Sequence, residues 1–260
     1  MHNWLTEFSN VCSFRKIRDE ALRGFKKGNV VFTNSFEHHG LDYEFKYHKA
    51  KLKKFASNYP GLVRYLKCFE SGCPSEMFEG GERCSELRLR VDIKKSTRRN
   101  QVCRLAELAL KAIKDNRRRH EGVEEFMLIN DKATIACEIP IWLWEKNMDI
   151  GVSGHIDILQ IRQGRIYILD FKPNAAQENE EKVVSQLYLY ALGLSFRTGI
   201  PLRMFRCAWF DEKIYYEFDP AEAKVETKKL YKKSRMEKIE KLLIRPLYKL
   251  LEDFLIPKLF

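Results

Sequence analysis

Two aspartates in a predicted β-hairpin are the residues of this chain whose types and spacing most clearly suggest chemistry. Two apolar segments, 155–161 and 166–172, flank the sequence RQGR, and apolar runs around a short Gly-containing turn predict a hairpin. With the central QG as the loop, Asp157 lies directly opposite Asp170. Side chains opposite each other on paired strands lie roughly 4.5–5.5 Å apart at Cβ, and like charges there are destabilising. The two facing carboxylates therefore need a compensating cation.

A divalent metal ion is the simplest cation for this position. Carboxylate oxygens are preferred ligands of Mg²⁺ and Mn²⁺, and the backbone carbonyl of Phe171 is a further candidate ligand beside Asp170. Lys172 follows on the same strand face, opposite His155, and can orient a water molecule or stabilise developing charge. The constellation suits metal-dependent hydrolysis of phosphodiesters. The alternative is that both aspartates end their strands and pair with Lys or Arg side chains.

Two neighbouring elements can bring further polar side chains to this hairpin. A helix predicted over 182–196 carries Gln186 and Tyr190 at positions i and i+4, so both project from the same side. A strand predicted over 132–141 carries Glu138 among apolar residues. Each of these side chains also has a plain structural alternative, as packing of the helix or the strand.

A helix with one apolar stripe is predicted before these strands. Ser96 or Thr97 can cap its start, and Glu107 lies at the margin of the stripe. The helix ends in the basic segment 116–120, where cations suit the negative end of the helix dipole. This segment is either a solvated helix end or a surface that contacts phosphate. Residues 126–129 are predicted as a strand.

The order of elements from residue 86 onward predicts an α/β fold, with mixed strands and helices between them. Other elements are expected as a helix over 3–26, a short strand over 30–33, helices over 50–59 and 62–69, an alternating strand over 86–93, and a long basic helix opened by Asp219-Pro220. The Gly- and Glu-rich loop 70–82 marks a predicted boundary between a helical N-terminal appendage, residues 1–83, and the main domain, residues 84–260.

The composition is that of a globular protein with a preference for polyanions. The chain has 260 residues, 45% of them hydrophobic, and a net charge of +11, which favours nucleic acid or acidic lipid as a partner. No apolar run is long enough to span a membrane, and MHNWLTEFSNVC does not resemble a secretory signal, so we expect a cytoplasmic protein. The 7 cysteines are expected to be reduced thiols. His38 and His39 have no acidic or Cys partner at ligand spacing and are predicted as solvated loop residues.

Three short motifs in the predicted hairpin and helix resemble the PD-(D/E)XK nuclease superfamily, in particular its RecB-like and CRISPR-associated exonuclease branch. The matching elements are G-x-x-D in the sequence GHID that ends at Asp157, D-x-K at Asp170-Phe171-Lys172, and Q-x-x-x-Y from Gln186 to Tyr190. The resemblance covers residues 97–218, and Glu138 looks like the acidic residue that often precedes G-x-x-D in this branch.

This resemblance implies a restriction-endonuclease-like core, a mixed sheet flanked by helices, and Mg²⁺- or Mn²⁺-dependent cleavage of DNA. It implies a set of roles for the motif residues: metal ligation by Asp157 and Asp170, catalysis by Lys172, and support of the site or contact with DNA by Gln186 and Tyr190. The family's first helix usually carries a Glu, often preceded by a His that also reaches the metal. Glu107 lies in the matching predicted helix without such a His, so it is a metal ligand or a solvated surface residue.

Residues around the predicted metal ligands are expected to support them. His155 and Glu138 are expected to contact the ligands without binding the ion. Some members of this branch carry an iron–sulphur cluster on one Cys before the core and three after it. Only Cys207 follows the core motifs here, so no such cluster is expected.

DNA, single- or double-stranded, is the predicted partner, and no membrane is expected. Nothing in the sequence suggests base-specific readout, and the basic helices fit non-specific binding of phosphates, as in an exonuclease or a processing nuclease. A helicase or another DNA-processing protein is a further candidate partner. The alternatives are a non-catalytic nucleic-acid-binding subunit of the same fold, a junction-resolving endonuclease, and an enzyme that acts on RNA.

Overall fold

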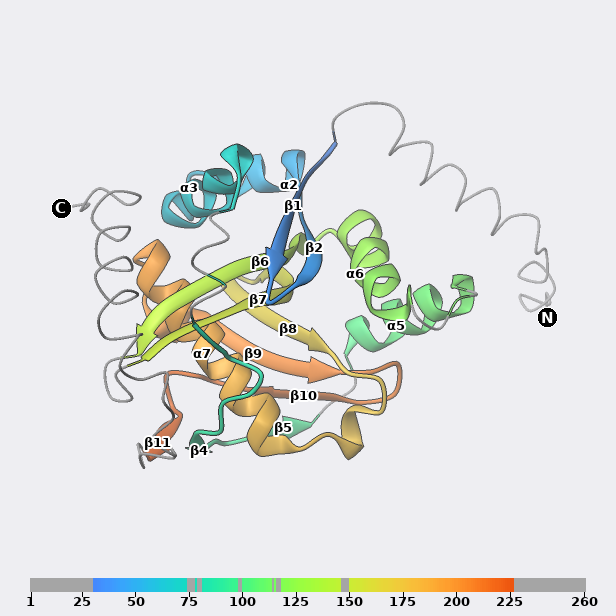
Figure 1. The fold of residues 1–260 in the computed structure, drawn as a ribbon. Coiled ribbons are helices and arrows are strands. Elements are labelled where there is room, and N and C mark those ends of the chain that lie inside the picture. Colours follow the sequence, from blue (N-terminus) through green and yellow to red (C-terminus); the bar gives the residue numbers. More distant parts are fainter. Residues whose placement is uncertain are drawn as a thin grey trace, which may run out of the picture.

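A mixed β-sheet is the frame of the computed structural model, which describes residues 30–73, 78, 81–97, 100–113, 115, 118–145 and 150–226. Nine strands belong to it in the described part of the chain, in the order β1-β2-β6-β7-β8-β9-β10-β5, with β3 joined to β7 (Figure 1). Their bounds are β1 Val31–His38, β2 Leu41–His48, β3 Glu82–Arg83, β5 Ser96–Thr97, β6 Thr134–Glu145, β7 Ile150–Arg162, β8 Arg165–Phe171, β9 Phe205–Phe210 and β10 Tyr215–Phe218. This architecture confirms the predicted α/β class and the restriction-endonuclease-like core.

Helices cover both faces of the sheet. The side chains of β8, Arg165–Phe171, alternate between these two faces. Ile166 and Ile168 pack in a hydrophobic cluster with α3 and α7, whereas Tyr167 and Leu169 pack in a second cluster with α5 and α6. Successive side chains of a strand point to opposite faces, so β8 is buried on both. The helices are α2 Lys49–Lys54, α3 Pro60–Cys68, α5 Gln101–Ala112, α6 Arg119–Asn130 and α7 Glu180–Thr198.

The central hairpin has the predicted register. The pairing of β7 with β8 joins Ile158 to Leu169, and the loop consists of Gln163 and Gly164. Both loop residues have left-handed backbones, with φ of 48° and 68°. Two such residues form the type I′ turn whose twist matches that of paired strands. The turn therefore fixes which residues face each other at the far end of the hairpin.

The helical region before the sheet differs from the prediction. Residues 126–129, predicted as a strand, lie in α6. Its buried residues Val123, Glu124, Met127 and Leu128 recur at the spacing of one helix face, and the short apolar run alone is compatible with either a strand or a helix.

The start of α5 also lies later than predicted. Asn100 caps this helix, because its side-chain oxygen accepts a hydrogen bond from the Val102 amide at 3.2 Å. Ser96 and Thr97, predicted as caps, instead form β5, which pairs with β10. The predicted helix corresponds to α5, which ends at Ala112, and a second helix, α6, begins at Arg119.

A β-hairpin before residue 50 extends the sheet. Strands β1 and β2 turn at His39 and Gly40, whose φ values of 51° and 74° are again left-handed, and β2 pairs with β6. Helices α2 and α3 match the two helices predicted over 50–59 and 62–69. The boundary at residue 83 stays a prediction, but the described part of residues 1–83 is not purely helical, since it contributes this hairpin to the main sheet.

The segments on either side of the core also differ from expectation. Only β4, Arg90–Asp92, forms within the strand predicted over 86–93, and it pairs with β11, Lys224–Glu226, in a separate two-stranded sheet. The helix predicted from Asp219 does not begin there: the Asp219 carboxylate accepts a hydrogen bond from the Ala221 amide in a turn, and β11 follows. The rest of that helix, 227–260, and the helix predicted over 3–26 lie outside the described residues. In the part of the chain that is described, no helix is long and apolar enough to cross a membrane.

Candidate active site

Asp157 and Asp170 lie side by side where β7 and β8 separate. They occupy the next positions after the last pair of the ladder, Ile158 with Leu169, and their side chains are almost fully buried. The ammonium of Lys172 lies 2.9 Å from Oδ1 of Asp170. The sequence-predicted trio is thus assembled in the predicted arrangement.

The predicted partnership of Lys172 with His155 is wrong. The ladder of β7 and β8 ends before these residues, and His155 is paired with Pro140 of β6. The Lys172 amide instead donates a hydrogen bond to the Phe210 carbonyl of β9 at 2.9 Å. Strand β7 leaves β8 here and opens a space in front of the two aspartates.

The two carboxylates have opposite pKa shifts. Burial, and then the negative charge of Asp170, raises the pKa of Asp157 well above its usual value. Burial alone would also raise the pKa of Asp170, but the ammonium of Lys172 and a hydrogen bond with Asp157 lower it. Oδ2 of each aspartate is buried without a hydrogen-bond partner among the described residues. Buried, unsatisfied carboxylate oxygens are costly, which indicates a site built for a cation.

His120 and Glu124 of α6 complete the charged centre, and the sequence analysis missed both. Nδ1 of His120 forms a hydrogen bond with Oε1 of Glu124 at 2.7 Å. Its Nε2 lies 2.7 Å from the Phe171 carbonyl oxygen and 3.4 Å from Oδ2 of Asp157. Ligand atoms of His120, Glu124 and Asp157 lie within 4.8 Å of one another. This group brings a His and a Glu from α6 to the two aspartates, whereas Glu107 belongs to the preceding helix, α5.

Glu107 lies away from this centre, on the surface of α5. Its carboxylate pairs with Lys111 one turn later at 2.6 Å, and both side chains are exposed. The predicted metal role of Glu107 is therefore not supported by its position. The signal that could have found Glu124 is the spacing His120 to Glu124, i and i+4, which places both side chains on one helix face.

Glu138 and His155 form a second polar pair next to the aspartates. The Glu138 carboxylate contacts Nδ1 of His155. Glu138 has a left-handed backbone, with φ of 51°, in the middle of β6. Such strain in a residue other than glycine costs on the order of 1–3 kcal/mol and is typical of functional sites. His155 lines the same cavity as Asp157, and the charge of Glu138 acts on Glu124. Their supporting role at the metal site stays a prediction.

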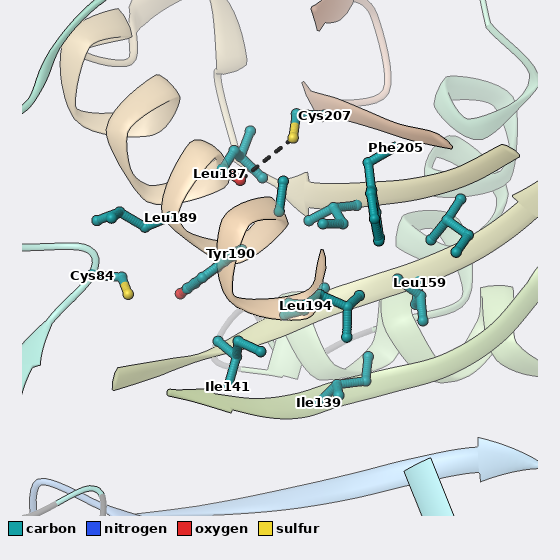
Figure 2. Packing of buried hydrophobic residues seen from close by; sticks show 14 of the residues in the cluster. Cys84, Ile139, Ile141, Leu159, Leu187, Leu189, Tyr190, Leu194, Phe205 and Cys207 are labelled. Atoms are coloured by element: carbon teal, nitrogen blue, oxygen red, sulfur yellow. Dashed lines mark hydrogen bonds between the residues drawn. The ribbon is translucent and has the colours of Figure 1, made fainter. Parts of the chain in front are cut away.

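Gln186 and Tyr190 meet the site from α7. The Gln186 side-chain amide donates a hydrogen bond to the Tyr190 hydroxyl at 3.0 Å, and both side chains are buried. Figure 2 shows the Tyr190 ring leaving α7 with its hydroxyl on the side of Cys84. The ring lies against Gly154: a Cβ at that glycine would be 2.6 Å from Cε1 of Tyr190. Gly154 therefore permits the close approach of α7 to β7.

Replacing Gly154 with alanine is expected to lower the free energy of unfolding by about 1–3 kcal/mol, because the added methyl group overpacks the Tyr190 ring. Urea denaturation measures this change. The matched control is the same substitution in a Tyr190→Leu background, where the cost should shrink because the ring is gone. An equal cost in both backgrounds would contradict the assigned contact.

A cavity of about 290 Å³ opens in front of these side chains. Asp157, Lys172, Gln186, Tyr190 and His120 all contribute to its wall. Arg83 and Lys182 also line it, so acidic and basic groups meet in one cavity.

The model of the PD-(D/E)XK nuclease superfamily matches residues 64–253, most of the chain. The chain belongs to the PD-(D/E)XK nuclease superfamily. Neither the search of curated proteins nor the search of solved structures gave a match. Membership of this superfamily indicates a metal-dependent nuclease.

The described side chains fit the divalent ion that PD-(D/E)XK nucleases use. The donor set contains carboxylates, one backbone carbonyl and an imidazole, which suits Mg²⁺ or Mn²⁺. The residues that would hold the ion are Asp157, Asp170, Glu124 and the Phe171 carbonyl, with His120 beside them. In the metal-free centre the positive charge comes from Lys172 and from His120, whose pKa is raised to about 10 by neighbouring carboxylates that outweigh its burial.

The metal-free protein is expected to become less stable as the pH rises through neutrality. Burial and then the charge of Glu138 raise the pKa of Glu124 from 4.5 to about 8, so the folded state holds a proton that the unfolded state has lost across that window. The raised pKa of His120 acts in the same direction. Its contribution to the free energy of unfolding is complete below pH 6.5 and is lost as the pH approaches about 10.

Thermal unfolding in a chelator, followed across this pH range, measures the effect. The midpoint should fall with rising pH, and saturating Mg²⁺ should flatten the dependence because the ion binds the deprotonated ligands. Glu124→Gln should also weaken the dependence of the unfolding midpoint on pH, whereas Glu107→Gln should leave that dependence unchanged. A midpoint that rises with pH in the metal-free wild type would contradict the assigned protonation.

Proposed function

We propose that this chain is a Mg²⁺- or Mn²⁺-dependent deoxyribonuclease that hydrolyses phosphodiester bonds at Asp157 and Asp170. The observation that carries the proposal is the buried carboxylate pair with Lys172 at its side. A protein that only binds nucleic acid gains nothing from burying two facing carboxylates, because their repulsion and desolvation reduce its stability. A metal-dependent hydrolase requires that arrangement.

Each residue of the centre has a proposed task. Asp157, Asp170 and Glu124 hold the metal ion together with the Phe171 carbonyl. A bound divalent ion supplies Lewis-acid stabilisation of the phosphate and favours ionisation of an attacking water molecule. Lys172, held by Asp170 at 2.9 Å, orients that water and stabilises charge on the phosphate oxygens as the bond forms. His120 bridges Glu124 and the Phe171 carbonyl, and thereby fixes the positions of two ligand groups.

DNA is the proposed substrate, and the enzyme is an exonuclease or a processing nuclease of the RecB-like branch. The hydrogen-bonded pair of Gln186 and Tyr190 on α7 supports this branch, since both residues line the same cavity as Asp157. Arg83 and Lys182 provide the positive charge that a phosphate backbone needs, without a base-reading element. A helicase or another DNA-processing protein is the proposed partner, and the cytoplasm the proposed location.

Cleavage of end-labelled DNA tests the proposal. Linear single- and double-stranded substrates, labelled at either end, are incubated with Mg²⁺ or Mn²⁺ and wild type or Lys172→Ala. We expect degradation that depends on the metal and is lost in the variant, with the position of the label revealing polarity. Equal, EDTA-insensitive behaviour of both proteins would refute the proposal, and cleavage of RNA alone would change the substrate.

A further inference from the structure

We propose that Lys46 of β2 and Lys51 of α2 are positioning residues for the metal site: they hold α6, the helix that carries Glu124. This inference rests on the proposed nuclease function, because Glu124 is a proposed ligand of the catalytic ion. Both lysines precede the segment that the superfamily model matches, residues 64–253. The two contacts, called the lysine anchor below, therefore come from a part of the chain outside the matched segment.

Helix α6 has weak local support at its start and needs contacts with other elements. Within the described residues, its N-cap residue Arg118 makes no capping hydrogen bond with its side chain. Gly122 lies in the helix interior, where glycine is less favourable than alanine because it loses more backbone freedom on folding. The position of α6 therefore depends on the elements that surround it, among them the β1–β2 hairpin beside it (Figure 1).

Lys46 reaches α6 from β2. The residue is only 5% exposed, and its ammonium lies 2.6 Å from Oε1 of Glu125 and 3.8 Å from Oε1 of Glu121. Burial alone would lower the pKa of Lys46, but hydrogen bonds with Glu125 and Glu44 raise it, so the ammonium stays charged. Apolar side chains of similar size would pack here at least as stably. The charged contact is therefore suited to fixing the place of α6.

The contact with Lys46 fixes the rotation of α6 about its axis. Glu125 directly follows Glu124, and Glu121 lies one turn before Glu125. Neighbouring residues of an α-helix are roughly 100° apart around the axis, so the pair that contacts Lys46 occupies the face next to that of Glu124. Glu124 shares its face with His120, where the ligand atoms of both lie within 4.8 Å of an aspartate oxygen. A helix held through Glu121 and Glu125 thus directs Glu124 at the metal site.

Lys51 holds the other end of the same helix. Its ammonium donates hydrogen bonds to the Leu128 carbonyl and, at 2.6 Å, to the Asp131 carbonyl. Carbonyls at the C-terminal end of a helix lack partners within the helix and carry the negative end of its dipole, so an ammonium suits them. This contact fixes the position of α6 along its axis.

The β1–β2 hairpin is a firmly packed base for the lysine anchor. Lys46 is paired with Cys137 of β6, and the Cys137 thiol contacts the Glu124 carbonyl at 3.5 Å. His38, predicted as a solvated loop residue, is instead the last residue of β1 and only 2% exposed. The hairpin is therefore part of the packed fold, and its contacts with α6 reach the residue next to the metal site.

Calorimetric titration of the full chain with Mn²⁺, without DNA, tests the lysine anchor. Lys51→Met and Glu125→Gln each remove one contact and leave every proposed metal ligand in place. Each should raise the Kd for Mn²⁺ about tenfold, the size found for groups that orient metal ligands. In a Glu124→Gln background each should change the Kd by about twofold or less, because the ligand that the anchor positions is gone. A change of overall stability or of nearby charge would act in both backgrounds.

Lys53→Met and Glu37→Gln are the matched controls, because these side chains are exposed on α2 and β1. They should leave the Kd within about twofold of wild type. The anchor is refuted if Lys51→Met and Glu125→Gln bind Mn²⁺ as tightly as wild type, or if they weaken binding equally in the Glu124→Gln background. If the Kd follows the anchor but no DNA is cleaved, the nuclease proposal fails while the anchor stands.

Discussion

Asp170→Asn is expected to lower the rate of phosphodiester cleavage by at least about 10³-fold and to weaken Mn²⁺ binding by at least about 100-fold. Asp170 is the carboxylate that Lys172 keeps ionised, so the isosteric amide removes the negative charge that a metal ion needs. Single-turnover cleavage and calorimetric titration with Mn²⁺ measure the two effects separately.

Lys172→Met and Asp42→Asn are the controls for Asp170→Asn: the first separates loss of rate from loss of metal binding, and the second is the same substitution at an exposed site. Lys172→Met should lose about 10²- to 10³-fold in rate and still bind Mn²⁺, because the lysine acts on water and phosphate and is not a ligand. Asp42 is exposed on β2, so Asp42→Asn should change neither quantity. Asp170→Asn with unaltered Mn²⁺ affinity would show that the ion binds elsewhere.

Glu124→Gln is expected to reduce cleavage by about 10²-fold or more, while Glu107→Gln leaves it within twofold or so of wild type. Both residues are glutamates on neighbouring helices, but Glu124 is buried against His120 and Glu107 is exposed in a pair with Lys111. The two isosteric substitutions therefore compare the two candidates for the helical acidic ligand directly. Cleavage rates at several Mg²⁺ concentrations measure the effect of each substitution on activity.

A rise in the Mg²⁺ concentration needed for half-maximal activity is expected for Glu124→Gln, because its loss weakens the ligand set. Thermal unfolding checks that the variant is folded. Loss of activity in Glu107→Gln, with Glu124→Gln active, would restore the assignment made from the sequence and contradict the observed geometry.

The central hairpin was predictable because its evidence is local. The QG turn fixes the register, the register sets Asp157 beside Asp170, and the apolar strands make two facing carboxylates unusual. The observed pairing agrees with this at every position up to the aspartates. Beyond them the prediction fails, since the ladder with β8 ends there while β7 continues along β6, and His155 does not lie opposite Lys172. Where this ladder ends depends on the pairing of β7 with a third strand, β6, which the sequence of the hairpin alone does not indicate.

His120 and Glu124 were missed for a reason that lies in the helices. The apolar segment 126–129 fits either a strand or a helix. Because it was predicted as a strand, His120 was placed in the basic end of the preceding helix and not in a helix with Glu124. The longer window from 119 to 130 contains the deciding pattern, with Val123 and Met127 buried four residues apart. Glu107 was predicted because it lies in α5, the helix that precedes the strands of the site, whereas His120 and Glu124 lie in the next helix, α6.

The approach of the β1–β2 hairpin to the cavity was not predictable from the sequence. His38 has no partner at metal-ligand spacing, and its place follows from the pairing of β2 with β6, residues far away in the chain. Contacts between distant strands are set by the whole sheet and not by a local pattern.

The position of a bound Mn²⁺ ion tests the proposed metal site at Asp157 and Asp170. Anomalous scattering from a crystal grown with Mn²⁺ locates the ion without reference to activity. The account predicts a peak in coordination contact with Asp157, Asp170 and the Phe171 carbonyl oxygen, with Glu124 or His120 beside it. A peak only at the exposed acidic group of Glu44, Glu121 and Glu125, or none at a saturating Mn²⁺ concentration, would contradict it.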